Sequence, residues 1–247
     1  MSEPPARPDR ARFFYTGSAV AMLILTFIGF QQFYLHGNTF VGGPLTPQLR
    51  TVVILHGICM SAWILMFLVQ PILVVANSRR THMFIGKIGV VLAICNLLLG
   101  LWVGVESSRY WEPDAMFWGF TGKQFMAIPV FAILSYAVFV AIGVWQRRRP
   151  EIHRPMMLMA TLMAVEAAFF RMWPNFLYQG TILQVVFGPA LGMLAFGLLL
   201  FVTHCLLTRS FDRWFAAGYV GMAASCILMN QIAGTSAWFR IATFLQQ

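Results

Sequence analysis

The stretch TVVILHGICMSAWILMFLVQPILVVANSRRTHMFIGKIG, residues 51–89, decides the fold class of this chain. An apolar run over residues 51–76 is followed by a short polar turn with two arginines, and apolar residues resume at residue 84. A helix needs about 20 apolar residues to cross the hydrocarbon core of a bilayer. The stretch therefore predicts one membrane-spanning helix, a turn at a membrane surface and the start of a second span.

The composition of the whole chain agrees with this interpretation. Of its 247 residues, 59% are hydrophobic and only 10% are charged, which is far less charge than a soluble domain of this length carries. The formal charge of +9 is spread over short clusters between apolar runs, so it forms no basic patch for nucleic acid. We expect an all-α, polytopic transmembrane helical bundle whose partner is the lipid bilayer, and no nucleic-acid partner.

The apolar segments define the expected domain organisation. Seven of them are long enough to span: residues 13–35, 51–76, 84–108, 125–146, 156–177, 184–207 and 215–245. They predict a single seven-helix transmembrane domain over residues 13–247, after an N-terminal tail of residues 1–12. Twelve lysines and arginines fall on one side of these spans and four on the other, which predicts a cytoplasmic N-terminus. The predicted location is the inner membrane of a bacterium, as a multi-pass protein.

Two histidines beside arginines are the leading candidates for a cofactor site. His82 opens the third predicted span and His153 precedes the fifth, both toward the cytoplasmic side. A b-type haem needs two neutral imidazoles from different helices at matching depth, and the pair meets these conditions. The sequence leaves open whether the rings face each other or separately contact headgroups. His56 lies about two turns inside the second span, where a histidine needs a hydrogen-bond partner or a ligand.

Ionisable residues at membrane depth are candidates for function, and the fifth span contains Glu166 and Arg171. Five positions place them about 140° apart on a helix, so each needs a partner from another helix. Glu166 is a proton-carrying or substrate-binding carboxyl, or a structural one. Arg171 is a structural cation or binds an anionic group. His153 and Arg171 are five turns apart and share a face if the helix continues back through Pro155.

A family resemblance rests on the segments HGICMSAWILMFLVQPILVVANSRRTHMFIGKIG (56–89) and HRPMMLMATLMAVEAAFFR (153–171). They resemble the bacterial multi-pass membrane proteins called domain of unknown function 2306 (DUF2306). That arrangement is loosely similar to cytochrome b561 and ferric-reductase-like membrane bundles, whose helix-borne histidines hold b haems. The resemblance implies haem iron ligated by His82 and His153, with His56 and Arg171 as further cofactor-binding residues. Because the fourth span contains no histidine, it implies at most one haem, on the cytoplasmic side.

Three functions follow as hypotheses, since no motif of a soluble enzyme occurs and the sequence does not decide whether the protein is an enzyme. The first is a haem-binding or quinone-linked redox protein that uses His82 and His153, with a quinone or a membrane redox partner. The second is a small-solute or proton transporter centred on Glu166. The third is a noncatalytic accessory or assembly subunit. Substrate, electron donor, electron acceptor and oligomeric state are not encoded in a recognisable pattern.

Overall fold

The computed structural model describes residues 10–39, 43–111, 115–172, 177–178 and 180–247. Most of the predicted N-terminal tail, residues 1–9, lies outside the described residues, and the first helix already begins at Arg10. The described chain is an all-α bundle with one small hairpin.

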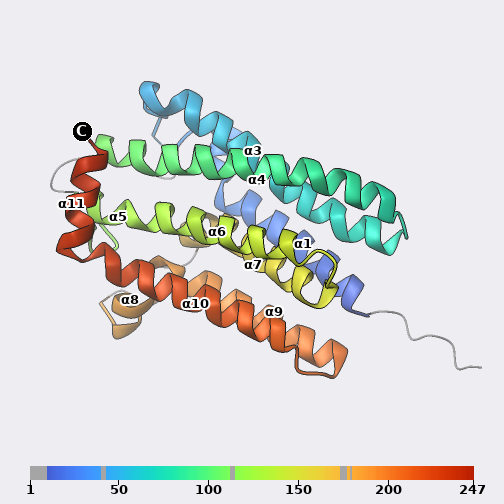
Figure 1. The fold of residues 1–247 in the computed structure, drawn as a ribbon. Helices are drawn as coiled ribbons and strands as arrows, with labels where there is room; N and C mark the ends of the chain where they lie inside the picture. The colour runs from blue at the N-terminus through green and yellow to red at the C-terminus, as the bar shows by residue number, and fades with distance from the viewer. Residues whose placement is uncertain (1–9, 40–42, 112–114, 173–176, 179) are drawn as a thin grey trace, which may run out of the picture.

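Seven long helices run side by side along one axis (Figure 1). They are α1 (Arg10–Gly29), α3 (Pro47–Val75), α4 (Arg79–Ser107), α6 (Ala127–Trp145), α7 (Pro150–Met172), α9 (Leu191–Thr208) and α10 (Arg213–Ala233). Short elements connect or follow them: α2 (Gln31–His36), η1 (Ser108–Tyr110), α5 (Gly122–Phe125), α8 (Ile182–Phe187), η3 (Gly188–Ala190), α11 (Ser236–Leu245) and the hairpin of β1 (Met116–Phe117) and β2 (Phe120–Thr121).

Six segments among the described residues are long and apolar enough to cross a bilayer. They correspond to α3, α4 with η1, α5 with α6, α7, α8 with α9, and α10; the apolar part of α1, Phe13–Gly29, is shorter. The protein is therefore a multi-pass membrane protein by the length and composition of its helices.

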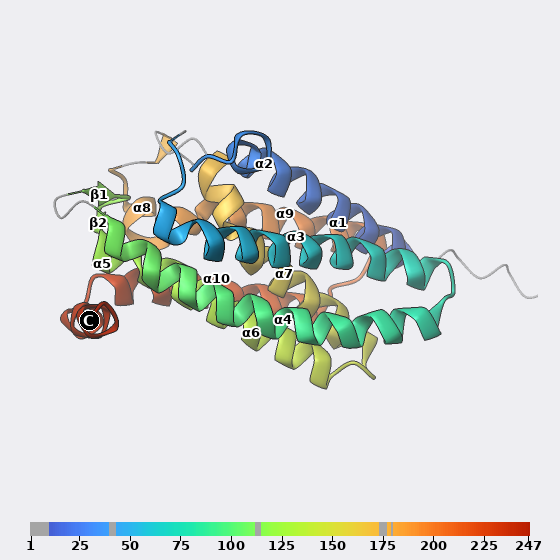
Figure 2. The ribbon, with the colours of Figure 1, turned by 90° about the horizontal axis from the view of Figure 1, so that it is seen from above.

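The helix α7 lies at the centre of the bundle. It packs against α1, α6, α9 and α10, while α3 and α4 pack mainly on each other and complete one side of the molecule (Figure 2). Accordingly α7 is the most buried of the candidate spans and α3 the least. A side chain on α7 is thus screened from lipid, whereas α3 presents much of its surface outward.

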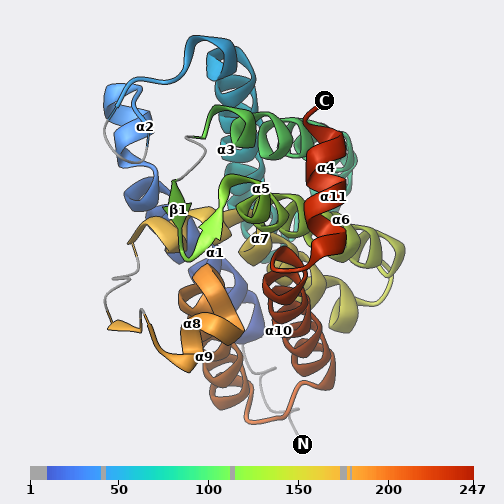
Figure 3. The same cartoon turned by 90° about the vertical axis from the view of Figure 1, so that its left-hand side faces the viewer.

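The two ends of the bundle differ in composition. The turns at 76–78, 146–149 and 209–212 share one end, which we call the basic end because it carries the following arginines: Arg79, Arg80, Arg147, Arg148, Arg149, Arg209 and Arg213. The β1–β2 hairpin, α5, α8 and α11 lie at the other end, the hairpin end, where α11 crosses the helix axes (Figure 3). This grouping of charges matches the one expected from the sequence.

The first predicted span, residues 13–35, is wrong as a single helix, because α1 ends at Gly29 and α2 starts at Gln31. A β-carbon at Gly29 would lie 2.7 Å from main-chain and side-chain atoms of Ala168 in α7. Glycine here allows the two helices to approach closely just before the chain turns.

The last predicted span, residues 215–245, is also two helices. The first, α10, ends at Ala233, and the side-chain oxygen of Thr235 accepts a hydrogen bond from the amide of Trp238 to cap α11. The sequence around this break is polar, NQIAGTS over residues 230–236, and Gly234 followed by a capping threonine is a local stop-and-start signal.

Two other boundaries shift. The helix α7 begins at Pro150, six residues before the predicted fifth span, since proline is favoured at the first helical position. The sixth span is interrupted at Gly188, whose φ of +53° suits glycine, so α8 and η3 precede α9.

Candidate functional site

His82 and His153 lie together at the basic end. His82 is in the first turn of α4, and the early start of α7 makes His153 helical as well. The centres of the two imidazole rings are 6.5 Å apart and their planes are nearly perpendicular, at 85°. The helices that carry them, α4 and α7, make few contacts with each other. Instead, α4 packs on α3 and α6, and α7 packs on α6. The rings therefore meet across the interior of a four-helix arrangement.

A main-chain carbonyl of a neighbouring helix orients each ring. The Nδ1 of His153 is 2.8 Å from the carbonyl oxygen of Gly143 in α6, and the Nδ1 of His82 is 3.4 Å from that of Gln70 in α3. A carbonyl only accepts hydrogen bonds, so Nδ1 carries the proton and Nε2 keeps its lone pair. Metal-binding histidines have this arrangement, in which the second nitrogen is held by an outer hydrogen bond.

Glycines and methionines line the helices next to the pair. Among the described residues outside its own helix turn, a β-carbon at Gly86, one turn after His82, would meet just the side-chain Nε2 of Gln70 within 4 Å, at 3.9 Å. The sulfurs of Met66 and Met157 lie against Gly89 and Gly143, at 2.7 and 2.8 Å from the β-carbon positions. Thioether side chains are flexible, so the walls here can adapt to a flat apolar group.

The other three histidines are elsewhere. His56 is fourteen residues before Gln70 in α3, about 21 Å toward the hairpin end by the helical rise. His36 is exposed in α2. His204 is buried in α9 among the rings of Phe14 and Phe215, and its Nδ1 is 3.9 Å from a carboxylate oxygen of Asp212. His56 is thus not part of the His82–His153 site.

Glu166 is buried in α7, with 5% of its surface exposed. Its Oε1 has no hydrogen-bond partner within the described part of the chain. Its carboxylate lies close enough to Tyr178 and Cys226 to interact with them electrostatically. Asn230 and Gln231 of α10 donate to the carbonyl oxygen of Val185, at 2.6 and 3.2 Å, and so tie α10 to α8.

Arg171 lies near the hairpin end of α7, about 27 Å along the helix from His153. Its Nη1 donates to the carbonyl oxygen of Ala167 at 2.6 Å, and its guanidinium carbon is 4.4 Å from the ring centre of Phe30. This cation–π contact is with the residue at which α1 turns into α2. The structure therefore places Arg171 apart from the two histidines, at the α1–α7 contact.

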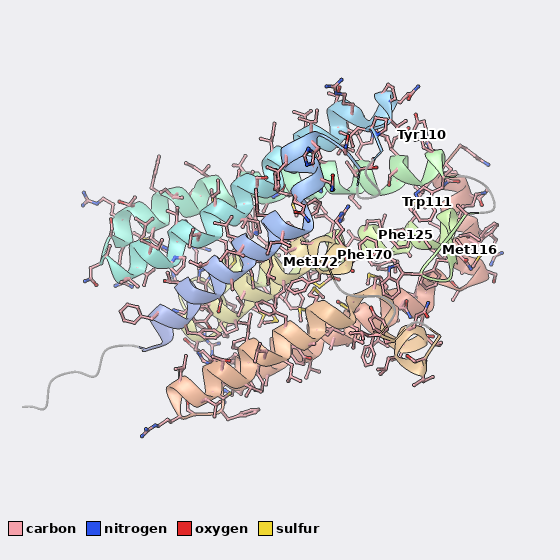
Figure 4. All side chains as sticks on the ribbon, turned by 180° about the vertical axis from the view of Figure 1, so that it is seen from behind. Tyr110, Trp111, Met116, Phe125, Phe170 and Met172 are labelled. Carbon is pink, nitrogen blue, oxygen red and sulfur yellow. The ribbon has the colours of Figure 1, made fainter. Side chains whose placement is uncertain are left out.

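Aromatic rings close the hairpin end beyond Glu166. Phe170 contacts Phe117 and Trp118 of the hairpin, with ring centres 5.1 and 6.2 Å apart, and Trp118 lies 5.3 Å from Tyr178. Figure 4 shows Phe170 at this end, with Trp111 and Phe125 nearby. The hydroxyl of Tyr178 donates to the carbonyl oxygen of Gly188 at 3.3 Å. These contacts join the end of α7 to the hairpin and to Tyr178.

Sequence reasoning missed two contributors to the histidine site. Gly143 acts through its main-chain carbonyl, and a main-chain contact cannot be predicted from the residue type. Gln70 carries a signal, since His56, Trp63 and Gln70 recur at seven-residue intervals on one face of α3. That this face lies next to His82 follows from the packing of α3 against α4, which the sequence does not show.

No three His, Cys, Asp or Glu side chains in the described ranges gather into a metal-binding group. Comparison of the chain with protein-family models, curated proteins and solved structures gave no match.

Proposed function

We propose that the protein is a b-type haem redox protein of the membrane, in which His82 and His153 would hold the haem iron. The observation that carries this proposal is the pair of imidazoles from two helices, each with its Nδ1 turned to a backbone carbonyl. Haem needs only two protein ligands, because the porphyrin supplies the other four nitrogens.

The spacing of the rings suits such a ligand pair. Two imidazoles bound on opposite sides of one metal ion, at about 2 Å each, have ring centres roughly 6 Å apart. The ring centres of His82 and His153 are 6.5 Å apart, close to this value. Perpendicular ring planes are compatible with it, because each ring can rotate about its own bond to the metal.

The residues around the pair have separable tasks in this proposal. A bound haem supplies a one-electron couple. The carbonyls of Gly143 and Gln70 fix the tautomer and the orientation of the two rings. The exposed arginines of the basic end provide positive charge for carboxylate groups of a cofactor or for an acidic face of a redox partner. A quinone or a membrane redox partner is the proposed source or acceptor of the electron.

A second haem in the hairpin-end half is not part of the proposal. There, a β-carbon at Gly100 would lie 2.7 Å from Ile133 and 3.3 Å from Cε1 of His56. Trp63 and Tyr136 also meet edge to face at 5.0 Å between the two halves. These contacts leave no room for a porphyrin at this level, and a one-haem protein exchanges electrons on one side of the membrane.

Visible spectroscopy of the purified full-length protein tests the proposal. We expect a Soret band and the bands of a six-coordinate b haem, with about one haem per chain. His82→Ala and His153→Ala should each remove most of the bound haem, whereas His36→Ala, at an exposed site in α2, should leave the spectrum unchanged. Protein expressed with haem supplementation that still lacks a Soret band contradicts the proposal.

Movement of protons or of a small solute through Glu166 is the second candidate function. It is supported by the buried carboxyl oxygen that has no hydrogen-bond partner among the described residues. In lipid vesicles, Glu166→Gln should abolish pH-dependent flux, while Glu151→Gln, at an exposed glutamate of the same helix, should not. Equal flux in wild type and Glu166→Gln excludes this function.

A further inference from the structure

The interior of α3, α4 and α6 holds a second group of polar side chains, away from the His82–His153 pair. Asn96 and Tyr136 are fully buried, with 0% exposure, and the Nδ1 of His56 is buried as well. Among the described residues, neither amide atom of Asn96, nor the Tyr136 hydroxyl, nor His56 Nδ1 has a hydrogen-bond partner.

These three side chains come from three helices, and contacts around Gly100 of α4 connect them. The ring of His56 lies against Gly100, and Asn96 is one turn before Gly100 on the same face of α4. Ile133 of α6 contacts Gly100 too, and Tyr136 is three residues further along that face of α6. The hydroxyl of Tyr136 faces the amide of Asn96, but the two groups do not meet hydrogen-bond geometry.

Buried polar groups in a membrane bundle require partners, because lipid offers none. Several unpartnered groups in one place therefore point to a bound species that completes their hydrogen bonds. We propose that His56, Asn96 and Tyr136 form an internal water-binding site in the hairpin-end half of the bundle.

The chemistry of the three groups selects water over other ligands. A buried water molecule makes about three hydrogen bonds, and the amide, phenol and imidazole offer both donors and acceptors. A metal ion is disfavoured because no cluster of three His, Cys, Asp or Glu exists in the described ranges. A larger organic ligand is disfavoured because Ile133 and His56 already lie within contact distance of the Gly100 position.

The site gives His56 a role that does not depend on haem. An imidazole bonded to internal water can exchange a proton with it, in a region that is otherwise apolar. Trp63 separates the site from His82 and His153, since its ring meets Tyr136 at 5.0 Å and its Nε1 donates to Thr161 at 3.3 Å. The water site and the proposed haem site are therefore adjacent but distinct.

Millisecond X-ray radiolysis of the full-length protein, read by mass spectrometry, tests this proposal. Hydroxyl radicals formed from bound water oxidise adjacent side chains even where bulk solvent has no access. We expect oxidation of Tyr136 to be at least about threefold faster than that of Phe215, which is equally buried at 0% exposure. Oxidation of Tyr136 at the rate of Phe215 overturns the proposal.

A variant pair provides the matched control. Asn96→Leu keeps the side-chain size but removes both amide atoms, so oxidation of Tyr136 should fall to roughly the Phe215 level. Thr161→Val removes a hydroxyl on the other side of Trp63 and should leave the oxidation unchanged. Unchanged oxidation in Asn96→Leu contradicts the site, and if that variant does not fold, the wild-type comparison decides. Either result is independent of the haem spectrum.

Discussion

A main-chain carbonyl holds the ring of His153. Its Nδ1 contacts the Gly143 carbonyl at 2.8 Å, and His82 has the equivalent contact with the Gln70 carbonyl at 3.4 Å. The orienting atoms thus belong to the backbones of α6 and α3, and they persist when the side chain at either position changes. This distinction can be tested at Gln70.

The variant Gln70→Leu should retain haem. It removes the side-chain Nε2 that donates to the carbonyl oxygen of His82 at 3.4 Å, but it keeps the carbonyl that faces His82 Nδ1. We expect unchanged haem stoichiometry and a loss of about 1 kcal/mol or less in the free energy of unfolding. The measurements are the visible spectrum and thermal unfolding in detergent. Haem loss as large as in His82→Ala would show that the side chain of Gln70, rather than its backbone, holds the ring.

Tyr178 should remain neutral in strongly alkaline solution. Burial raises the pKa of its phenol well above the ordinary value, and the negative charge of Glu166 raises it further. Its hydroxyl should therefore still donate to Gly188 at about pH 11, where ordinary tyrosines ionise. The tyrosinate absorbance gained by about pH 11 should be equal in wild type and Tyr178→Phe. A smaller gain in the variant, by about one of the six tyrosines, contradicts the expected direction.

At the scale of elements, the contact between α1 and α7 depends on one glycine. A β-carbon at Gly29 would lie 2.7 Å from the Cα, Cβ and carbonyl oxygen of Ala168, and a backbone in a central helix cannot move aside easily. A β-carbon at Gly17, also in α1, would meet no atom of another described element within 4 Å. The two glycines form a matched pair within one helix.

We expect Gly29→Ala to lower the free energy of unfolding by about 1–3 kcal/mol through overpacking. Gly17→Ala should change it by less than about 1 kcal/mol, in the stabilising direction, because alanine favours helix. Thermal unfolding of both variants in the same detergent measures the difference. Equal melting temperatures of the two variants would mean that a wider separation of α1 from α7 does not lower the free energy of unfolding.

At the scale of the whole molecule, orientation in the membrane is open to direct measurement. The arginine-rich turns lie at the basic end and the C-terminus lies at the hairpin end (Figure 1). Since positive loops remain in the cytoplasm, we expect the C-terminus on the outside. Alkaline phosphatase fused after Gln247 should be active, and green fluorescent protein fused there should not fluoresce. The reverse pattern would contradict the proposed orientation.

The sequence was sufficient to predict much of this fold. The predicted spans 51–76 and 125–146 agree closely with α3 and α6. A long apolar run bounded by polar turns can satisfy its backbone hydrogen bonds in a bilayer only as a helix or in a closed barrel. The breaks at Phe30 and Gly234 were missed, although polar residues follow each of them directly, Gln31 and Gln32 at the first and Thr235 and Ser236 at the second. Their signals are local, in close helix contact at Gly29 and in capping by Thr235.

The candidate site was predictable only in part. Matching depth identified His82 and His153 as a pair, but whether they face each other depends on the rotation of α4 and α7 about their axes. That rotation is set by how α4 and α7 pack against α3 and α6. It therefore cannot be predicted from the sequence of one helix. Arg171 and His56 were expected beside the same cofactor, and the structure places them toward the other end, because a shared helix face does not imply a shared depth.

The helices differ in length, and this difference affects how accessible the histidine pair is from the membrane surface. The helices α3 and α4 have 29 residues each, about 43 Å, whereas α10 has 21 residues, about 31 Å, close to the thickness of bilayer hydrocarbon. The turn between α3 and α4 accordingly extends beyond the other turns of the basic end (Figure 1). His82 is only about 5 Å along α4 from that overhanging tip. In the proposed haem protein, a quinone headgroup or a partner protein would therefore reach the pair at the membrane surface, beside this tip.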